Sequence, residues 1–326
     1  MANSRNSEPP EPLLAAVGAC LRRHVRAPAR LLLGFSGGRD SLAMLHALRM
    51  LRPDFGYELS ALHVNHGISV EADRWQTFCV HCCAELDVAL RCERVEVPRD
   101  AAEGLEAAAR TLRHAALARV AADWVVLAHH RGDQAETLLF NLLRGAGLRG
   151  AAAMRETRSF TSASTLIRPF LALSRGDIDA YLQAHELTWI DDASNADIGF
   201  SRNYVRHQVL PLLTARFPAA EAKLASAARH FAEAEQLLDA LARLDLGAQP
   251  PEFPLPVAKL VALDDARGRN LLRFMLAQRS IPIASEQRLG EFLRQVRSAG
   301  PDRHPSVVFG SSRLSCRGRQ VHLEYL

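Results

Sequence analysis

Lysine is nearly missing from this chain of 326 residues, which contains 38 arginines but only Lys223 and Lys259. Neither lysine follows a glycine-rich stretch, so the chain lacks the G-x-x-x-x-G-K-[ST] loop with which kinases and GTPases bind phosphate. Arginine-rich surfaces suit phosphate backbones, because a guanidinium group can form two parallel hydrogen bonds to one phosphate.

Long apolar runs are missing as well. No stretch approaches the ~18 apolar residues that a membrane span requires. The polar segment 1–12 contains several prolines and lacks the apolar core of a secretory signal. With 48% hydrophobic and 23% charged residues, the composition is that of a globular protein. We therefore expect a cytoplasmic protein of two domains with loosely held first residues.

Cysteine pairs at metal-ligand spacing are scarce. Cys79 and Cys82 form one C-x-x-C next to Cys83, and the sequence contains no second pair of this spacing. The pair could hold a metal or an iron–sulfur cluster, or take part in redox chemistry. Residues 71–86 are expected to form a helix that places all three thiols on one face. We therefore favour a buried helix face over a metal site.

A glycine-rich turn follows the apolar run Leu31–Phe35 and precedes a helix-like stretch at 42–51. It reads Ser36-Gly37-Gly38-Arg39-Asp40-Ser41. Adjacent glycines let backbone N–H groups approach an anion closely, and the N-terminus of a helix adds its positive end. The sequence thus predicts a phosphate-binding loop, and an ordinary glycine turn between strand and helix is the alternative.

Apolar runs alternate with helical patterns through the first two thirds of the chain. Strands are expected at 30–35, 59–64, 89–97 and 124–128, and helices at 41–51, 71–86, 105–121 and 133–143. This alternation predicts an α/β fold in which a parallel sheet has helices on both faces. Polar clusters at 36–41, 63–67 and 129–134 each follow a strand. Because ligands bind beyond the carboxyl ends of parallel strands, we expect these clusters to share one site.

Helical patterns dominate the rest of the chain. Residues 157–165 are rich in serine and threonine and are expected to form a mobile loop or insertion. Helices are expected at 174–185, 202–217, 219–241, 262–279 and 285–298, and short strands near 307–309, 313–316 and 321–323. We place the domain boundary between residues 217 and 218, so that 1–217 form a catalytic domain and 218–326 a smaller, mainly helical domain.

The net charge of +4 is concentrated in the last 35 residues. Six arginines there face two acidic residues, which are Asp302 and Glu324. Such a surface suits the phosphate backbone of a nucleic acid. The alternative is that the arginine excess reflects codon composition and a solvated surface.

Taken together, these motifs resemble those of the tRNA(Ile)-lysidine synthase family within the PP-loop ATP pyrophosphatase superfamily. The resemblance runs from Leu31 to Pro211 and rests on SGGRDS, on HVNHG at 63–67, on the run 105–114, on HHRGDQAET followed by LLRGAGLRG, on the RPF at 168–170, and on the segment 189–206. It implies a Rossmann-like PP-loop domain followed by a helical domain that binds tRNA.

The resemblance also implies a reaction. The family uses ATP to join free L-lysine to C2 of the wobble cytidine, position 34, of the isoleucine tRNA with a CAU anticodon. The cytidine is first adenylated, and AMP and pyrophosphate are the products. ATP and Mg²⁺ are thus the expected cofactors. The sequence does not indicate the oligomeric state.

Residue roles follow from the same resemblance. The loop residues that would cradle the phosphates of ATP are Ser36, Gly37, Gly38, Arg39, Asp40 and Ser41, with Asp40 also expected to bind Mg²⁺. His63 and His66, with His129 and His130, would shape the nucleotide pocket. A zinc site at these histidines is disfavoured because no acidic or cysteine partner is evident.

Three further pairs would act on the substrates. Arg110 and Arg113 share a helix face and would stabilise phosphate charge during adenylation. Asp133 and Glu136 stand three residues apart, so both carboxylates face one way and would hold the charged groups of lysine. Arg202 and Arg206 would bind the lysine carboxylate or the tRNA backbone. The alternatives are carboxylates that merely favour a helix N-terminus and arginines on a solvated surface.

Three departures from the family pattern leave other interpretations open. Gly132 stands where the family usually has aspartate, Ile68-Ser69 replaces a common Leu-Arg, and the third domain of longer members is absent from this sequence. We expect tRNA recognition to depend more on the anticodon arm. A PP-loop tRNA thiolase and a tRNA-binding homologue with impaired catalysis remain the alternatives.

Overall fold

The computed structural model describes residues 11–67, 69, 71–98, 104–190, 199, 201–279, 281, 286–300 and 303–326. The chain divides into two compact units, Met1–Ala232 and Glu233–Leu326. Helix α10 (Ala220–Leu246) belongs to both units, and the boundary expected at 217 and 218 lies just before it and remains a prediction. Over the described residues, no helix is both long and apolar enough to cross a membrane.

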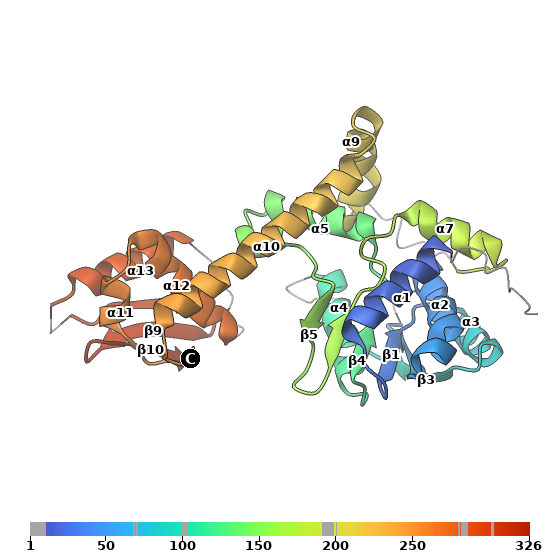
Figure 1. The fold of residues 1–326 in the computed structure, drawn as a ribbon, viewed down its shortest axis with the longest axis horizontal. Helices are drawn as coiled ribbons and strands as arrows, with labels where there is room; N and C mark the ends of the chain where they lie inside the picture. Colours follow the sequence, from blue (N-terminus) through green and yellow to red (C-terminus); the bar gives the residue numbers. More distant parts are fainter. Residues whose placement is uncertain are drawn as a thin grey trace, which may run out of the picture. The chain divides into compact units, whose positions relative to one another are not determined.

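A six-stranded sheet with the order β3-β2-β1-β4-β6-β5 forms the centre of the first unit (Figure 1). Its strands are β1 (Arg30–Gly34), β2 (Glu58–Asn65), β3 (Ala89–Arg94), β4 (Trp124–Val126), β5 (Thr157–Ser159) and β6 (Thr165–Ile167). All neighbours pair in parallel except β5, which pairs antiparallel with β6. The predicted parallel sheet is confirmed.

Helices cover both faces of this sheet. The helices of the first unit are α1 (Pro12–His24), α2 (Arg39–Phe55), α3 (Ala72–Glu85), α4 (Leu105–Ala118), α5 (Arg131–Leu143), α6 (Leu148–Ala151), α7 (Arg175–Ala184), α8 (Ser201–Tyr204) and α9 (Leu210–Arg216). Leu31 and Leu33 of β1 lie in one core with α1, α2, α3 and α7, whereas Leu32 lies in another core with α4. This follows from the alternation of side chains along a strand, because β1 is central and buried on both faces.

One expectation about this unit is wrong, and one expected helix forms with a local irregularity. Residues 157–165 are not a loose insertion, because β5 and β6 extend the sheet as a hairpin in which Phe160 N–H donates to Ser164 O at 3.0 Å. The helix expected at 202–217 is interrupted by a π-helical turn at Val205–Val209 between α8 and α9. In the β5–β6 hairpin, hydrogen bonds between the strands hold a polar segment in the sheet, although its composition alone predicts a loop.

The second unit has its own core and its own sheet. It contains the end of α10, the helices α11 (Val257–Val261), α12 (Asp265–Gln278) and α13 (Glu286–Ser298), and the strands β7 (Leu255–Pro256), β8 (Ser306–Phe309), β9 (Ser312–Arg317) and β10 (Gln320–Tyr325). The strands form an antiparallel sheet in the order β7-β10-β9-β8. Phe274 and Phe292 lie in the core between the helices and the sheet. The unit is mainly helical, as predicted.

Candidate active site

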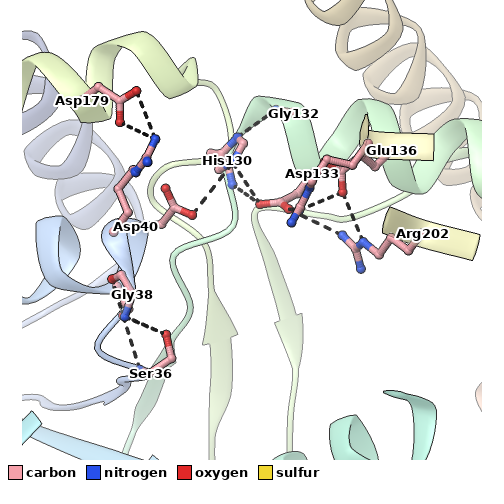
Figure 2. Close-up of polar contacts among 12 residues, drawn as sticks. Ser36, Gly38, Asp40, His130, Gly132, Asp133, Glu136, Asp179 and Arg202 are labelled. Carbon is pink, nitrogen blue, oxygen red and sulfur yellow. Dashed lines mark hydrogen bonds and ion pairs between the residues drawn. The ribbon is translucent and has the colours of Figure 1, made fainter. Parts of the chain in front are cut away.

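The predicted loop connects β1 to α2 at the carboxyl edge of the sheet. Ser36 Oγ accepts the Gly38 N–H at 3.3 Å (Figure 2). It also lies 3.1 Å from Ser41 Oγ, and the Ser41 hydroxyl donates to Gly38 O at 2.9 Å. These serine side chains tie the turn together, and helix α2 begins at Arg39. The strand–turn–helix arrangement therefore directs the first N–H groups of α2 beyond the sheet edge, where an anion can bind.

Gly37 is the loop residue that must be glycine. Its φ is +81°, and a Cβ atom there would lie 2.8 Å from Cys79 Sγ of α3. Gly38 has a φ of −76°, and a Cβ there would have 3.5 Å to its nearest neighbour. The loop thus packs directly on α3 at Gly37 and has space at Gly38.

These two glycines provide a matched test of the loop. We expect Gly37→Ala to lower the free energy of unfolding by about 1–3 kcal/mol, because it adds both a strained φ and a contact with a buried sulfur atom. Gly38→Ala should change it by less than about 0.5 kcal/mol. Urea denaturation of both variants measures the difference, and equal stabilities would contradict the packing described.

Asp40 lies in the first turn of α2 and faces α5. Its Oδ1 atom is buried and has no hydrogen-bond partner among the described residues, and its Oδ2 lies 4.0 Å from His130 Nε2. Burial raises the pKa of the Asp40 carboxyl, His130 lowers it and Asp133 raises it, and the net shift is upward. A buried carboxylate oxygen without a protein donor is the kind of hard ligand that Mg²⁺ prefers, so this residue fits the expected metal.

The Arg39 side chain is held on the side of α7. Its guanidinium group contacts Asp179 at 3.0 Å and lies over the ring of Trp189, 4.7 Å from the centroid. The structure thus places Arg39 between α2 and α7, and its expected contact with phosphate remains a prediction.

His130 lies between the loop and α5, and the sequence predicted for it only a part in shaping the nucleotide pocket. As the N-cap residue of α5, it accepts the Gly132 N–H on Nδ1 at 3.0 Å. A neutral ring must then carry its proton on Nε2, which lies 3.7 Å from Asp133 Oδ2 and 4.0 Å from Asp40 Oδ2 (Figure 2). The imidazole therefore stands between two carboxylates from different strand ends.

Gly132 is matched to this imidazole. A Cβ at position 132 would lie 2.7 Å from His130 Cε1 and 3.1 Å from Nδ1. A residue with a side chain would therefore displace the ring from its place as the cap of α5. The glycine that departs from the family pattern is thus part of the arrangement that orients His130.

Asp133 and Glu136 lie beside Arg202 and Arg206 in a group of four charges, which we call the charge quartet; its carboxylates are buried and its arginines half-buried. Arg206 binds Glu136 Oε1 at 2.6 Å and Asp133 Oδ1 at 2.9 Å. Arg202 binds Glu136 Oε2 at 3.3 Å and lies 3.6 Å from Asp133 Oδ1. The two carboxylates come from α5, and the arginines come from α8 and the π-helical turn that follows it. Two residue pairs that the sequence assigned to the substrate thus meet at one place.

The ionisation of Asp133 depends on its neighbours. Burial raises the pKa of its carboxyl, but His130, His129, Arg202 and the backbone N–H of His130 together lower it to about 2. Its folded pKa is below the ordinary value of about 4 for aspartate. The carboxylate is therefore ionised at neutral pH and stabilises the fold there.

This shift predicts a pH dependence. Because the folded pKa is depressed, the contribution of Asp133 is present above about pH 4 and is lost as the pH falls from there toward about 2. The difference in free energy of unfolding between the wild type and Asp133→Asn should become smaller over that window and should stay constant between pH 5 and 7. Urea denaturation at each pH measures both proteins, and an advantage independent of acid pH would contradict this assignment.

The remaining predicted site residues gather at the same sheet edge. His63 lies behind the loop, where its Nδ1 contacts Phe35 O at 3.0 Å, and burial lowers its pKa. Burial, Arg113 and His63 lower the pKa of His66 to about 4, so His66 is neutral. Arg110 lowers the pKa of His129, on which burial has the largest effect. Helix α4 thus presents its two arginines to the neutral histidines at this edge.

The C-x-x-C cysteines are in the core. Cys79, Cys82 and Cys83 are buried on one face of α3, as expected, and pack with the residues of the first core. Cys79 Sγ lies 3.3 Å from His63 Nδ1, and burial raises the pKa of this thiol. These are features of a packed helix face, and they provide no exposed thiol pair near the loop.

Two predicted features cannot be placed. Ile68 and residues 191–198 and 200 lie outside the described residues. Within that motif the structure describes Gly199 and the residues from Ser201 onward, with Arg202 in the charge quartet.

Comparison with known proteins gives consistent matches. A family model described as a PP-loop domain matches residues 15–213, and one described as the TilS substrate binding domain matches residues 255–323. The tRNA(Ile)-lysidine synthase of Aromatoleum aromaticum is 50% identical over 82% of this chain and 63% of its own length. That of Xanthomonas campestris is 40% identical over 91% of this chain and 68% of its own length. The chain spans somewhat less than two thirds of the length of several such relatives.

A solved structure shares the fold. The U34-tRNA thiolase NcsA from Methanococcus maripaludis, with its [4Fe-4S] cluster, superposes with a TM-score of 0.57 at 17% identity, over 68% of this chain and 78% of that chain. This likeness supports the Rossmann-like architecture of the first unit. It carries no argument about the reaction, because the identity is low.

Proposed function

This chain belongs to the tRNA(Ile)-lysidine synthase family, and from that premise we propose that it joins free L-lysine to C2 of the wobble cytidine, position 34, of the isoleucine tRNA with a CAU anticodon. ATP supplies the adenylyl group, and AMP and pyrophosphate are released. The observation that carries the proposal is the meeting of the phosphate loop, Asp40, His130 and the charge quartet at one sheet edge (Figure 2).

The proposed reaction has two steps. The oxygen on C2 of the cytosine attacks the α-phosphorus of ATP, and the bond to pyrophosphate breaks. The neutral side-chain amine of lysine then attacks C2, loses a proton, and displaces AMP together with the former C2 oxygen. Adenylation is needed because the C2 carbonyl is a poor electrophile and its oxygen a poor leaving group. Mg²⁺ bound at Asp40 would neutralise charge on the departing pyrophosphate.

The phosphate loop and α4 act on the first step. Backbone N–H groups at the start of α2 bind phosphate oxygens, and Ser36 and Ser41 hold the loop in the shape that presents them. Arg110 and Arg113 stabilise the charge that develops on the α-phosphate. Because His66 is neutral, it adds no positive charge that would compete with Arg110 and Arg113 for the phosphate.

The charge quartet would bind lysine by an exchange of partners. The quartet has two negative and two positive groups, and the α-ammonium and α-carboxylate of lysine present one of each. The ammonium group can pair with Asp133 and Glu136, and the carboxylate with Arg202 or Arg206. Exchanging one hydrogen-bonded cation for another keeps each buried carboxylate paired, so the exchange leaves no buried charge without a partner. The side-chain amine then extends toward the adenylated base.

We assign residues 218–326 to tRNA binding, with the anticodon arm as the main contact. The second unit contains the arginine-rich end of the chain and the region matched by the substrate binding model. Arginine suits the phosphate backbone of RNA because of its bidentate geometry.

A single assay tests this function. The purified protein is incubated with isoleucine tRNA transcript, ATP, Mg²⁺ and labelled lysine, followed by nucleoside analysis and separation of the spent nucleotide. We expect lysidine, AMP and pyrophosphate, with release of pyrophosphate beyond the first turnover only when tRNA and lysine are both present. ADP as the product would contradict the proposal. A protein that binds the tRNA without releasing pyrophosphate would be a homologue with impaired catalysis, and an iron–sulfur absorption band would favour a thiolase.

A further inference from the structure

A cavity of about 580 Å³ opens between α9 and α10 in the first unit. Its apolar lining includes Leu213, Phe217 and Leu224, and Arg216 and Lys223 provide its basic groups. None of the residues that line it in the described part of the chain is acidic. The cavity has the size of a small-ligand site, but its basic groups distinguish it from a purely apolar groove.

Phe217 presents an unusual surface. Its side chain is 58% exposed at the corner where α9 ends, and the Arg216 guanidinium carbon lies 5.3 Å from the ring centroid. The guanidinium lies over the exposed ring, and a nucleobase can stack on an aromatic ring or on a guanidinium plane. The neighbouring cations Arg216 and Lys223 can then meet the phosphate groups on either side of that base.

The position of the cavity connects it to the site already described. Glu221, in the first turn of α10, accepts a hydrogen bond from Arg131 Nε at 3.0 Å. Arg131 is the residue that follows His130 in the chain. Leu224 packs in the small core that contains Ala135 of α5 and Val205 of the π-helical turn. The start of α10 and the cavity wall at Leu224 therefore contact the helical segments that carry the charge quartet, within the same compact unit.

We propose that this cavity holds an unpaired anticodon-loop nucleotide of the tRNA, other than the cytidine that is modified. The inference rests on the proposed function, which brings an RNA loop to the adjacent sheet edge. Single-stranded RNA bases are bound by stacking on aromatic side chains, with sequence-tolerant contacts to the backbone. The basic rim favours this occupant over an apolar protein segment.

Binding of a fluorescent anticodon stem–loop RNA tests the proposal. We expect Phe217→Ala to raise Kd roughly 5- to 100-fold, because one base loses its stacking surface, whereas Phe217→Tyr should stay within about twofold of the wild type. Lys223→Gln should raise Kd and reduce its dependence on salt. Met50→Ala is the matched control, because Met50 is a comparably exposed apolar side chain, at 51% exposure, and lies in α2, outside the residues assigned to tRNA binding.

A duplex RNA of equal length without a loop distinguishes stacking from general attraction. Its Kd should not change in Phe217→Ala. An unchanged Kd for the stem–loop, an equal loss for the duplex, or a change in oligomeric mass on ultracentrifugation would each overturn the inference, the last indicating a protein contact.

Lysidine formation by the wild type is measured in parallel: if it occurs while Phe217→Ala binds normally, the cavity inference fails and the proposed function stands. A Phe217-dependent Kd without lysidine formation would support the cavity and refute the function.

Discussion

Replacement of Asp40 by asparagine is expected to reduce lysidine formation by about 10³-fold or more. The reason is that Asp40 Oδ1 is buried without a hydrogen-bond partner among the described residues, and Oδ2 lies 4.0 Å from His130 Nε2. Asparagine has nearly the same shape but cannot neutralise a metal ion. The measurement is the rate of pyrophosphate release in the presence of tRNA and lysine.

The stability of the same variant distinguishes a catalytic loss from misfolding. Because burial raises the pKa of Asp40, its ionised form is a cost to the folded state, so Asp40→Asn should be as stable as the wild type or more stable. Asp54→Asn, an exposed position on the same helix, is the matched control and should retain full activity. An Asp40→Asn enzyme with wild-type turnover would show that the loop does not work as proposed.

Glu136→Gln should cause the largest loss of stability at the site. It leaves the half-buried Arg206 with a single carboxylate partner, and because this arginine keeps contact with solvent, the cost should lie near or below the low end of the about 3–5 kcal/mol for a fully buried ion pair. The midpoint of thermal unfolding should fall by roughly 10 °C. Lysidine formation should be lost at temperatures where the variant is still folded, because the ammonium group of lysine loses one of its two carboxylates.

A double variant separates the two roles of the charge quartet. Removal of both Glu136 and Arg206, each replaced by leucine, leaves Asp133 and Arg202 as a neutral pair 3.6 Å apart. Replacement of a buried ion pair by apolar residues is often neutral or stabilising, so most of the stability should return. Activity should remain absent. If activity returned together with stability, the quartet would be a structural feature and would not bind lysine.

Several features of the site were predictable from local patterns. Leu31–Phe35 is a central strand because it is continuously apolar, and Gly37-Gly38 must follow it as a turn because a helix pattern begins directly afterwards. Asp133 and Glu136 share a helix face because they are three residues apart. These inferences need no knowledge of distant segments, since strand, turn and helix periodicity are properties of neighbouring residues.

Other features depend on segments that are far apart in the chain. The sequence predicted that Asp133 and Glu136 hold the charged groups of lysine, and that Arg202 and Arg206 bind the lysine carboxylate or the tRNA backbone. The structure pairs these carboxylates with these arginines. The π-helical turn that places Arg206 beside Glu136 has no sequence pattern that predicts it. His130 was singled out as a strand-end residue, whereas its orientation depends on the space left by Gly132.

The sequence by itself determined the parallel sheet, the edge at which the polar clusters lie, and the family to which their order belongs. Only the tertiary structure decided which charges neutralise one another, which carboxylate oxygen lacks a donor, and where an aromatic ring stays exposed. The physical reason is that periodicity arises within a few consecutive residues. Burial and the electrostatic field at a side chain arise from groups that folding brings together across scores of positions.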